Sequence, residues 1–252
     1  MNLIRSHNWL ALSEQFLHSK PYNHVVIDNF FEDAVAEKLV EEFPDYDSSK
    51  WGVYYNNALE NKKTCNDWNS FPSTTYSVFS YLCGIEFTSN LRILVGNQNC
   101  VPDVGLHGGG WHAHTINGKL NIHLDYSIHP KLHLERHYNI IIYLTPGWNS
   151  SWGGGLELWS HNADTNQPLE CVQTIENRFN RAVIFDTTQN SWHGLPKDLT
   201  CPEGQVRRSL AMYYVSDPAS TMSTRPRALF APYGNQHNDD KVLELIRQRS
   251  NL

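Results

Sequence analysis

The chain has 252 residues, of which 40% are hydrophobic and 18% charged, and its formal net charge is −6 with histidine neutral. A chain of this size can bury a full core as one large domain or two small ones, which excludes global disorder. The acidic balance, without a block of lysine and arginine, disfavours nucleic acid and anionic membranes as partners. Thirteen histidines, eight tryptophans and twelve tyrosines supply metal ligands and general bases beside flat apolar surfaces.

The cysteine spacing and the N-terminus bear on the cellular compartment. Five cysteines are scattered without a C-x-x-C spacing, which argues against a zinc ribbon or a thioredoxin-type redox pair and suits reduced thiols. The N-terminal residues lack the uninterrupted apolar stretch of a signal peptide, and no run approaches the ~18 apolar residues of a membrane span. We therefore expect a soluble cytoplasmic protein with no membrane partner.

The first hundred residues are expected to be mainly helical. Apolar spacing predicts four helices and one strand, the helices near residues 9–17, 32–43, 75–82 and 86–94 and the strand over residues 24–27. Pro21 and Pro44 end the first two helices, because proline cannot continue the hydrogen-bond ladder.

Residues 45–70 interrupt this pattern with a polar composition in which Trp51, Tyr54 and Tyr55 are interspersed. We expect a long surface loop here, and long loops in compact domains are more often functional than idle. The segment is therefore a candidate mobile lid over a substrate.

After Val101 the chain turns to short alternating segments separated by Gly, Pro, Asn and Asp, which predict a β-barrel or sandwich. Asn117-Gly118 predicts a hairpin between residues 112–114 and residues 119–121. Residues 239–249 predict a terminal helix packed on the barrel. The clearest strands are expected over residues 119–125, 138–144, 156–159, 182–185 and 207–215.

A candidate metal site begins in the first of these strands. Side chains alternate faces along a strand, so His123 and Asp125 point the same way, opposite to Leu120 and its apolar alternates. His193, in a W-H-G turn after an apolar strand, is expected to reach the barrel mouth as a third ligand. Two histidines and one carboxylate leave three open positions, the arrangement of non-haem Fe(II) oxygenases.

A candidate carboxylate clamp begins the last predicted strand. Strict alternation puts Arg207 on one face with Ser209 and Tyr213. A planar guanidinium is suited to a bidentate grip on a carboxylate, and a neighbouring hydroxyl adds a donor. Arg208 would take this place if the register slipped by one residue. We favour Arg207 because it shares its face with Ser209.

Five ordered segments together resemble the Fe(II)/2-oxoglutarate-dependent dioxygenases, and within them the prolyl 4-hydroxylase-like branch. In chain order they are N-I-H-L-D, N-I-I-I-Y-L-T, W-G-G-G-L-E-L-W, R-A-V-I-F-D-T-T-Q-N-S-W-H-G and R-R-S. The resemblance covers roughly residues 22–232. It implies an α+β, mainly β chain whose core is a double-stranded β-helix, or jelly roll, with N-terminal supporting helices and a C-terminal helix.

The domain organisation that we expect is a single domain over residues 1–252. Residues 1–100 would form the helical support region and lid loop, residues 101–232 the double-stranded β-helix core, and residues 233–252 the C-terminal helix.

The same resemblance implies roles for individual residues. His123, Asp125 and His193 would hold Fe(II), with 2-oxoglutarate as cosubstrate and O2 at the remaining position. Arg207 would complete the catalytic set by binding the C5 carboxylate, with Tyr143 and Ser209 as further candidate contacts to the cosubstrate. The implied reaction hydroxylates an unactivated C–H bond and releases succinate and CO2. Ascorbate is a candidate accessory reductant.

The prime substrate and the oligomeric state stay open. A prolyl residue in an extended peptide and a free amino acid, saccharide or other small metabolite suit the same iron centre. A non-catalytic cupin-like metal or ligand binder is the alternative from another class. Arg207 beside three metal ligands argues against that alternative, because a binder needs no cosubstrate clamp.

Two further histidine patterns resemble metal-binding motifs but are not expected to bind a metal. His107, His112 and His114 include an H-x-H arm, but they lack a matching third ligand, so we expect hydrogen-bonded or substrate-facing histidines. Residues 133–137 imitate a zincin motif, yet their glutamate stands at the third position and the segment leads into a strand. Tyr143 also has an alternative role as a core aromatic side chain.

Overall fold

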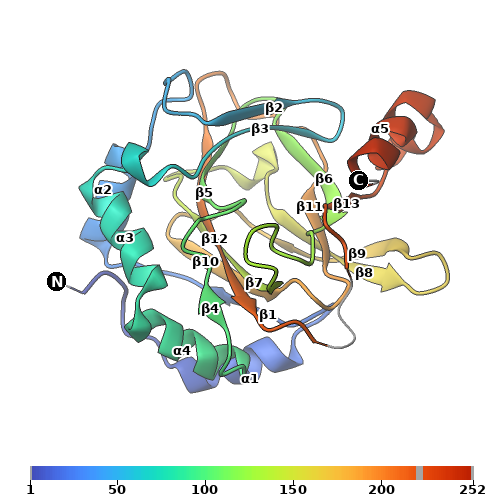
Figure 1. Ribbon diagram of the computed structural model, residues 1–252. Helices are drawn as coiled ribbons and strands as arrows, with labels where there is room; N and C mark the ends of the chain where they lie inside the picture. The colour runs from blue at the N-terminus through green and yellow to red at the C-terminus, as the bar shows by residue number, and fades with distance from the viewer. Residues whose placement is uncertain (1, 220–223, 251–252) are drawn as a thin grey trace.

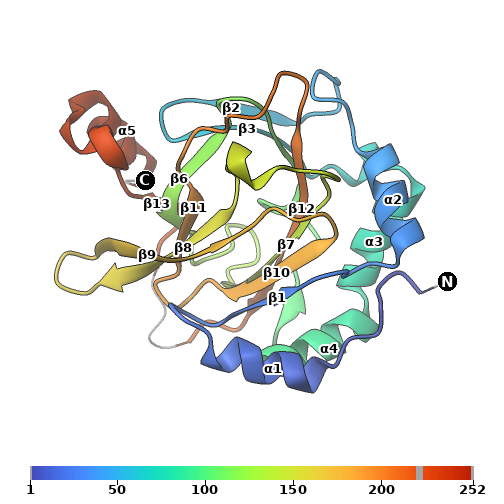
Figure 2. The same ribbon diagram turned by 180° about the vertical axis from the view of Figure 1, so that it is seen from behind.

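The computed structural model describes residues 2–219 and 224–250. Strands form a barrel, with α1 to α4 along one side and α5 on the other (Figures 1 and 2). The helices are α1 (Trp9–His18), α2 (Asp33–Glu42), α3 (Ser73–Cys83), α4 (Ile85–Val95) and α5 (Asp240–Ser250), with 3₁₀ turns η1 (Trp68–Ser70), η2 (Ser150–Trp152) and η3 (Gly234–Asn238). All five predicted helices are therefore present; residues 251–252 of the predicted C-terminal region lie outside the described residues.

Thirteen strands are present among the described residues. They are β1 (His24–Ile27), β2 (Val53–Asn56), β3 (Glu60–Cys65), β4 (Val101–Pro102), β5 (Gly110–His114), β6 (Lys119–Leu124), β7 (Glu135–Tyr143), β8 (Leu156–Asn162), β9 (Gln167–Ile175), β10 (Arg181–Asp186), β11 (Trp192–Leu195), β12 (Arg207–Ser216) and β13 (Leu229–Phe230).

The strands pair in the order β1-β10-β7-β12-β5-β3-β6-β11-β8-β9, with β13 on β6, β2 on β3 and β4 on β12. Neighbouring strands run antiparallel, and the sheet curls into a nearly closed barrel. This architecture confirms the predicted jelly-roll double-stranded β-helix.

Alternation along the strands divides the barrel wall into two faces. Ile140 and Ile142 of β7 and Met212 of β12 point outward and join one apolar cluster with Phe79 of α3 and Leu91 of α4. That cluster attaches the helical layer to the barrel by removing apolar surface from water. The alternate residues of the same strands point inward, where they line a cavity of about 570 Å³.

The predicted loop over residues 45–70 is wrong in part, because β2 and β3 form a hairpin within it. β3 then pairs with both β5 and β6. Gly110 permits this pairing: at its φ of 89°, a Cβ atom would collide with the carbonyl oxygen of Cys65. The polar sequence of β3 concealed a strand, because Glu60 and Lys62 turn toward the cavity and away from an apolar core.

The predicted hairpin at Asn117-Gly118 is also wrong, although the turn itself forms. Gly118 N donates to Thr115 O at 2.7 Å, and Asn117 has a positive φ of 61°. The strands on either side are nevertheless not partners, since β3 lies between β5 and β6. An inserted strand far away in the sequence has replaced the local pairing.

Within the described part of the chain, no helix is both long enough and apolar enough to span a membrane.

Candidate active site

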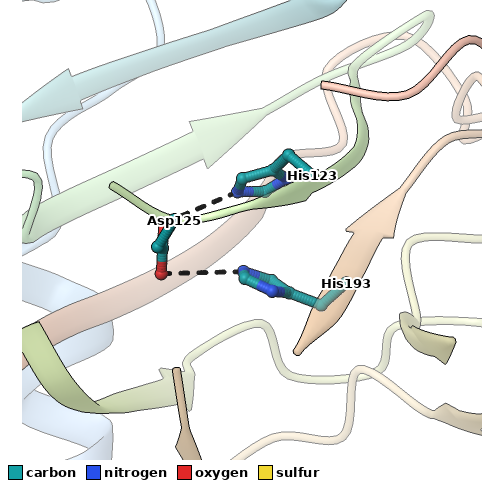
Figure 3. Close-up of side chains that lie close together, drawn as sticks. All are labelled: His123, Asp125 and His193. Atoms are coloured by element: carbon teal, nitrogen blue, oxygen red, sulfur yellow. Dashed lines mark ion pairs between the residues drawn. The ribbon is translucent and has the colours of Figure 1, made fainter. Parts of the chain in front are cut away.

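Three side chains predicted as metal ligands converge inside the cavity. His123 lies on β6, Asp125 directly follows that strand, and His193 lies on β11, which is a strand and not the predicted turn. His123 and His193 are paired across the two strands. The Asp125 carboxylate faces both imidazoles from one side, with its Oδ1 3.7 Å from His123 Nε2 and its Oδ2 3.9 Å from His193 Nε2 (Figure 3). The candidate ligand atoms all lie within 4.8 Å of one another.

Backbone carbonyls orient both imidazoles. The Nδ1 atom of His123 is 2.9 Å from Asn121 O, and that of His193 is 2.7 Å from Ser191 O. A carbonyl only accepts, so each Nδ1 carries the proton and each Nε2 presents a lone pair to the shared point. This support is typical of histidines that bind a metal.

Electrostatics keep His123 and Asp125 in the forms that bind a metal. Burial, followed by the neighbouring His193, lowers the pKa of His123 to about 3. Burial raises the pKa of Asp125, but the surrounding groups, His193 foremost, outweigh it and leave that pKa below its ordinary value. The Oδ2 atom of Asp125 is buried and has no hydrogen-bond partner in the described residues. The neutral imidazole of His123 beside an ionised carboxylate with an unpaired oxygen fits Fe(II).

Arg207 lies in the same cavity, and its position depends on a glycine. The side chain is 3% exposed, and its Nε donates to Gly154 O at 2.7 Å. Gly154 has a φ of 80°, and a Cβ atom there would lie 3.0 Å from Arg207 Cδ. Glycine at this position therefore leaves room for the arginine and permits the backbone turn that holds it.

Strand alternation decides which of the residues predicted around Arg207 face the cavity and which face outward. Ser209 lies on the inward face and lines the cavity. Tyr143 is fully buried, with its ring 5.0 Å from Arg207 Cζ, and its hydroxyl has no hydrogen-bond partner in the described residues. Arg208 points outward and lies 5.9 Å from the ring of Phe43. Arg207 thus lies inside the barrel, on the face that the predicted register gave it. The cosubstrate roles of Arg207, Ser209 and Tyr143 stay predictions.

The three histidines that include the H-x-H arm, His107, His112 and His114, also line the cavity. His112 and His114 on β5 face Ser209 and Arg207 on β12. Burial, together with the nearby cations, lowers the pKa of His112 to about 3 and that of His114 well below its usual value. Both imidazoles are therefore neutral, and the unpaired buried nitrogens that they carry are available to a ligand. His107 packs edge-on against Tyr126.

The aromatic residues of the predicted lid lie in two different parts of the molecule. Tyr55 lines the cavity, as do Glu60 and Lys62 of β3. Trp51 instead packs on Phe43 in the cluster under the helices. The β2–β3 hairpin is thus one wall of the cavity, with its aromatic residues divided between the two sides.

Two cavity residues were missed or given no role by the sequence reasoning. Tyr213 donates through its hydroxyl to Asp125 Oδ1 at 3.4 Å, and burial and then Asp125 raise the pKa of that phenol. Arg136 was seen only as part of a false zincin motif, yet it lines the cavity. Simple alternation from Tyr143 back along β7 would send Arg136 outward.

A β-bulge explains the position of Arg136. β12 advances by one residue, from Tyr214 to Val215, while its partners on β7 advance by two, from Tyr138 to Arg136. The extra residue, His137, reverses the alternation and turns Arg136 inward. A period-two pattern does not show a bulge of this kind, so the sequence carried no signal for the inward position of Arg136.

Comparison with known proteins gives a consistent result. The family profile described as "2OG-Fe(II) oxygenase superfamily", where 2OG is 2-oxoglutarate, matches residues 110–215. A curated relative, prolyl 3-hydroxylase OGFOD1 of Xenopus laevis, is 30% identical over 111 residues, which is 43% of this chain and 20% of the relative. The chain thus spans about a fifth of the length of that relative.

Solved structures share the fold at low sequence identity. A Pseudomonas putida prolyl-4-hydroxylase superposes with a TM-score of 0.58 at 13% identity, covering 84% of this chain and 100% of the other. HygX of Streptomyces hygroscopicus, solved with nickel, 2-oxoglutarate and hygromycin B, has a TM-score of 0.54 at 13% identity, with 88% and 90% of the two chains covered.

Proposed function

Because this chain belongs to the 2OG-Fe(II) oxygenase superfamily, we propose that it is an Fe(II)- and 2-oxoglutarate-dependent dioxygenase that hydroxylates an unactivated C–H bond of a prime substrate. The observation that carries the proposal is that Arg207 shares one cavity with His123, Asp125 and His193. A buried guanidinium is costly unless an anion binds it. A dicarboxylate cosubstrate would supply that anion beside the metal, whereas a simple metal binder would not.

Each residue has a defined task in this proposal. His123 and His193 would bind Fe(II) through Nε2, and Asp125 through a carboxylate oxygen. Arg207 would bind the C5 carboxylate of 2-oxoglutarate, with Ser209 as a second donor. Fe(II) and 2-oxoglutarate, when bound, supply the oxidation by O2 that forms succinate and CO2 and hydroxylates the substrate. Tyr213 holds the Asp125 carboxylate from the side by its 3.4 Å hydrogen bond.

The burial of the three candidate metal ligands supports the same proposed chemistry. His123, Asp125 and His193 are each less than a tenth exposed, and Phe230 stacks on the His123 ring at 5.3 Å between centroids. Exclusion of water strengthens the electrostatic contacts and protects reactive species from side reactions.

Two substrate classes have support. A prolyl residue in a peptide is supported by relatives named as prolyl hydroxylases. A small metabolite is supported by the cavity of about 570 Å³, which lies within the usual range for small-molecule sites, and by the structural neighbour bound to hygromycin B.

The test of the proposal is substrate-stimulated formation of succinate from 2-oxoglutarate. Fe(II)-loaded protein would be assayed against proline-containing peptides, free amino acids and sugars. We expect at least one class to stimulate turnover above the basal rate, with a mass increase of one oxygen in the product. Protein that binds Fe(II) but neither binds nor turns over 2-oxoglutarate would contradict the proposal.

A further inference from the structure

Charged side chains gather on one wall of the cavity, where β3, β13 and α5 meet. β11 pairs with β6 along one edge, at Leu120 and His123. Along the other edge, the same two residues pair with β3 and with β13 in turn. Residues of α5 join Leu59 and Phe230 in one apolar cluster at this junction, and Figure 1 shows α5 beside β13 and β6. Three segments far apart in the sequence thus form the wall next to His123.

Each of these segments contributes one cation to the lining of the cavity. Lys62 comes from β3, Arg227 from the residues before β13, and Arg249 from α5. Glu60 of β3, which is 3% exposed, contacts two of them. Its Oε1 accepts from Arg249 Nη2 at 2.6 Å, and its Oε2 lies 3.3 Å from Lys62 Nζ. One buried carboxylate therefore holds two cations close together and offsets the charge of only one.

Arg227 adds a third positive charge to this wall. The residue is exposed, and within residues 2–219 and 224–250 it forms no hydrogen bond or ion pair. An exposed arginine without a partner is ordinary when it stands alone. Here it lines the same cavity as Lys62 and Arg249, so the wall has an excess of two positive charges over the single charge of Glu60.

The metal and the cosubstrate of the proposed function would not offset this excess. The negative charges of 2-oxoglutarate and Asp125 balance the positive charges of Fe(II) and Arg207. Among the described residues, five of the chain's 20 lysines and arginines line the cavity but only two of its 26 acidic residues do, although the net charge of the chain is −6. A positive cavity in an acidic chain complements an anion. The five cations are Lys62, Arg136, Arg207, Arg227 and Arg249, and the two carboxylates are Glu60 and Asp125.

A phosphoryl group matches the charge and the arrangement of this wall better than a carboxylate does. A phosphate monoester carries about two negative charges at pH 7, which equals the excess on the wall. Its oxygens accept charge-assisted hydrogen bonds from several directions, whereas a planar carboxylate is matched by a single guanidinium. Cations from three separate segments, one of them a lysine, therefore suit the tetrahedral group.

The wall lies within reach of the candidate metal position. The ring of Phe230 stacks on that of His123 at 5.3 Å between centroids, and Arg249 Cζ lies 5.3 Å from the centroid of Phe230. The guanidinium of Arg249 is therefore at most twice 5.3 Å, or about 11 Å, from the His123 ring. A small metabolite can span this length with its phosphoryl group on the wall and a C–H bond at the metal.

We propose that Lys62, Arg227 and Arg249 bind a phosphoryl group of the prime substrate, which is thereby a small phosphorylated metabolite. The inference rests on the proposed function and names its substrate class. The three cations are specificity-determining residues: they contact the substrate away from the reacting C–H bond and are separate from Arg207, which binds the cosubstrate in the proposed function.

Calorimetric titration with inorganic phosphate and with acetate tests the proposal. The full chain is loaded with redox-inert Mn(II) and saturated with 2-oxoglutarate, which occupies the metal and Arg207, before either anion is added. We expect phosphate to bind at least tenfold more tightly than acetate. Arg227→Met and Lys62→Met should each weaken phosphate binding at least fivefold. Lys241→Met makes the same change in net charge at an exposed position of α5 and should bind phosphate as the wild type does.

The outcomes separate this inference from the proposed function. Failure of 2-oxoglutarate to bind in the loading step overturns the proposed function and the inference with it. If 2-oxoglutarate binds, then equal affinities for phosphate and acetate overturn the inference alone. Phosphate binding that Arg227→Met and Lys62→Met both leave unchanged has the same consequence, since the phosphate would then lie on the metal or elsewhere.

Melting temperatures distinguish ligand binding from support of the fold. Arg227 has no partner to lose within the described residues, so ligand-free Arg227→Met should melt at the temperature of the wild type. Arg249→Met removes the 2.6 Å contact to buried Glu60 and, as the reference for a structural cation, should melt at a lower temperature. A lower melting temperature of Arg227→Met together with unchanged phosphate affinity would assign Arg227 to the fold and overturn the proposal.

Discussion

His123 and His193 are cross-strand neighbours with the same support: each donates through Nδ1 to the carbonyl oxygen of the residue two positions earlier. Their ring centroids lie 4.4 Å apart. A shared backbone geometry on β6 and β11 therefore aims both Nε2 atoms at one point, beside the carboxylate of Asp125. The candidate ligand set is preorganised by the antiparallel pairing of two strands.

Replacing His123 or Asp125 with Ala should abolish stoichiometric Fe(II) binding, because two ligands in this geometry leave the metal without a facial triad. We expect the affinity to fall at least 100-fold, measured by anaerobic titration with metal analysis. His18→Ala, at an exposed position on α1, is the control and should bind as the wild type does. Full Fe(II) occupancy with normal turnover in either ligand variant would mean that the ligands lie elsewhere.

Arg207→Met should weaken 2-oxoglutarate binding about 10- to 100-fold, since a charge-assisted hydrogen bond contributes about 1.5–3 kcal/mol. Arg208→Met is the matched control on the opposite face and should change the dissociation constant less than threefold. The measurement is calorimetric titration of 2-oxoglutarate into metal-loaded protein. The reverse ranking of the two variants would place the wrong arginine in the site.

Gly154→Ala should weaken 2-oxoglutarate binding about tenfold, or about 1.4 kcal/mol, because its methyl group displaces Arg207. The variant also carries a left-handed backbone cost of about 1 kcal/mol. Gly147→Ala separates the two effects: Gly147 has a φ of 65°, and no atom lies within 4 Å of the point that a Cβ would occupy there. That control should lose stability but keep its affinity; a loss of affinity in both variants would contradict the steric explanation.

The neutral imidazole of His112 predicts a pH-dependent stability. Because burial and nearby cations lower its folded-state pKa to about 3, against about 6.5 in the unfolded chain, the folded state binds fewer protons. The stability is complete above pH 6.5 and is lost as the pH falls toward 3. Between pH 6.5 and pH 5, the wild type should lose about 1–2 kcal/mol more unfolding free energy than His112→Gln. Urea denaturation of the metal-free proteins measures this difference. Equal losses of unfolding free energy in the wild type and His112→Gln would contradict the prediction.

Much of the fold was predictable because its elements follow regular periods. The helix over residues 32–43 buries one stripe of apolar residues at helical spacing. Successive side chains of the strand that begins at Arg207 alternate between the cavity and the apolar cluster under the helices, so the faces of both elements could be assigned from spacing. The same alternation placed His123, Arg207 and Ser209 toward one interior. The resemblance to a known family then ordered these positions into a candidate site.

The remaining features depend on contacts that no local pattern encodes. β3 is polar because Glu60 and Lys62 face the cavity, so it lacks the apolar alternation by which a strand is recognised. β9 escaped prediction since most of its residues are exposed. Two register shifts, one turning Arg136 inward and one bringing Leu120 to the cavity wall, reverse the faces that strict alternation assigns. Bulges of this kind arise from pairing between distant strands.

Anaerobic addition of Fe(II) and then 2-oxoglutarate tests whether this cavity binds the metal and the cosubstrate together, because it detects the chelate without a prime substrate. We expect a weak visible charge-transfer band that saturates at one equivalent of each and is lost in His123→Ala. Protein shown to contain stoichiometric Fe(II) that develops no such band with saturating 2-oxoglutarate would contradict it.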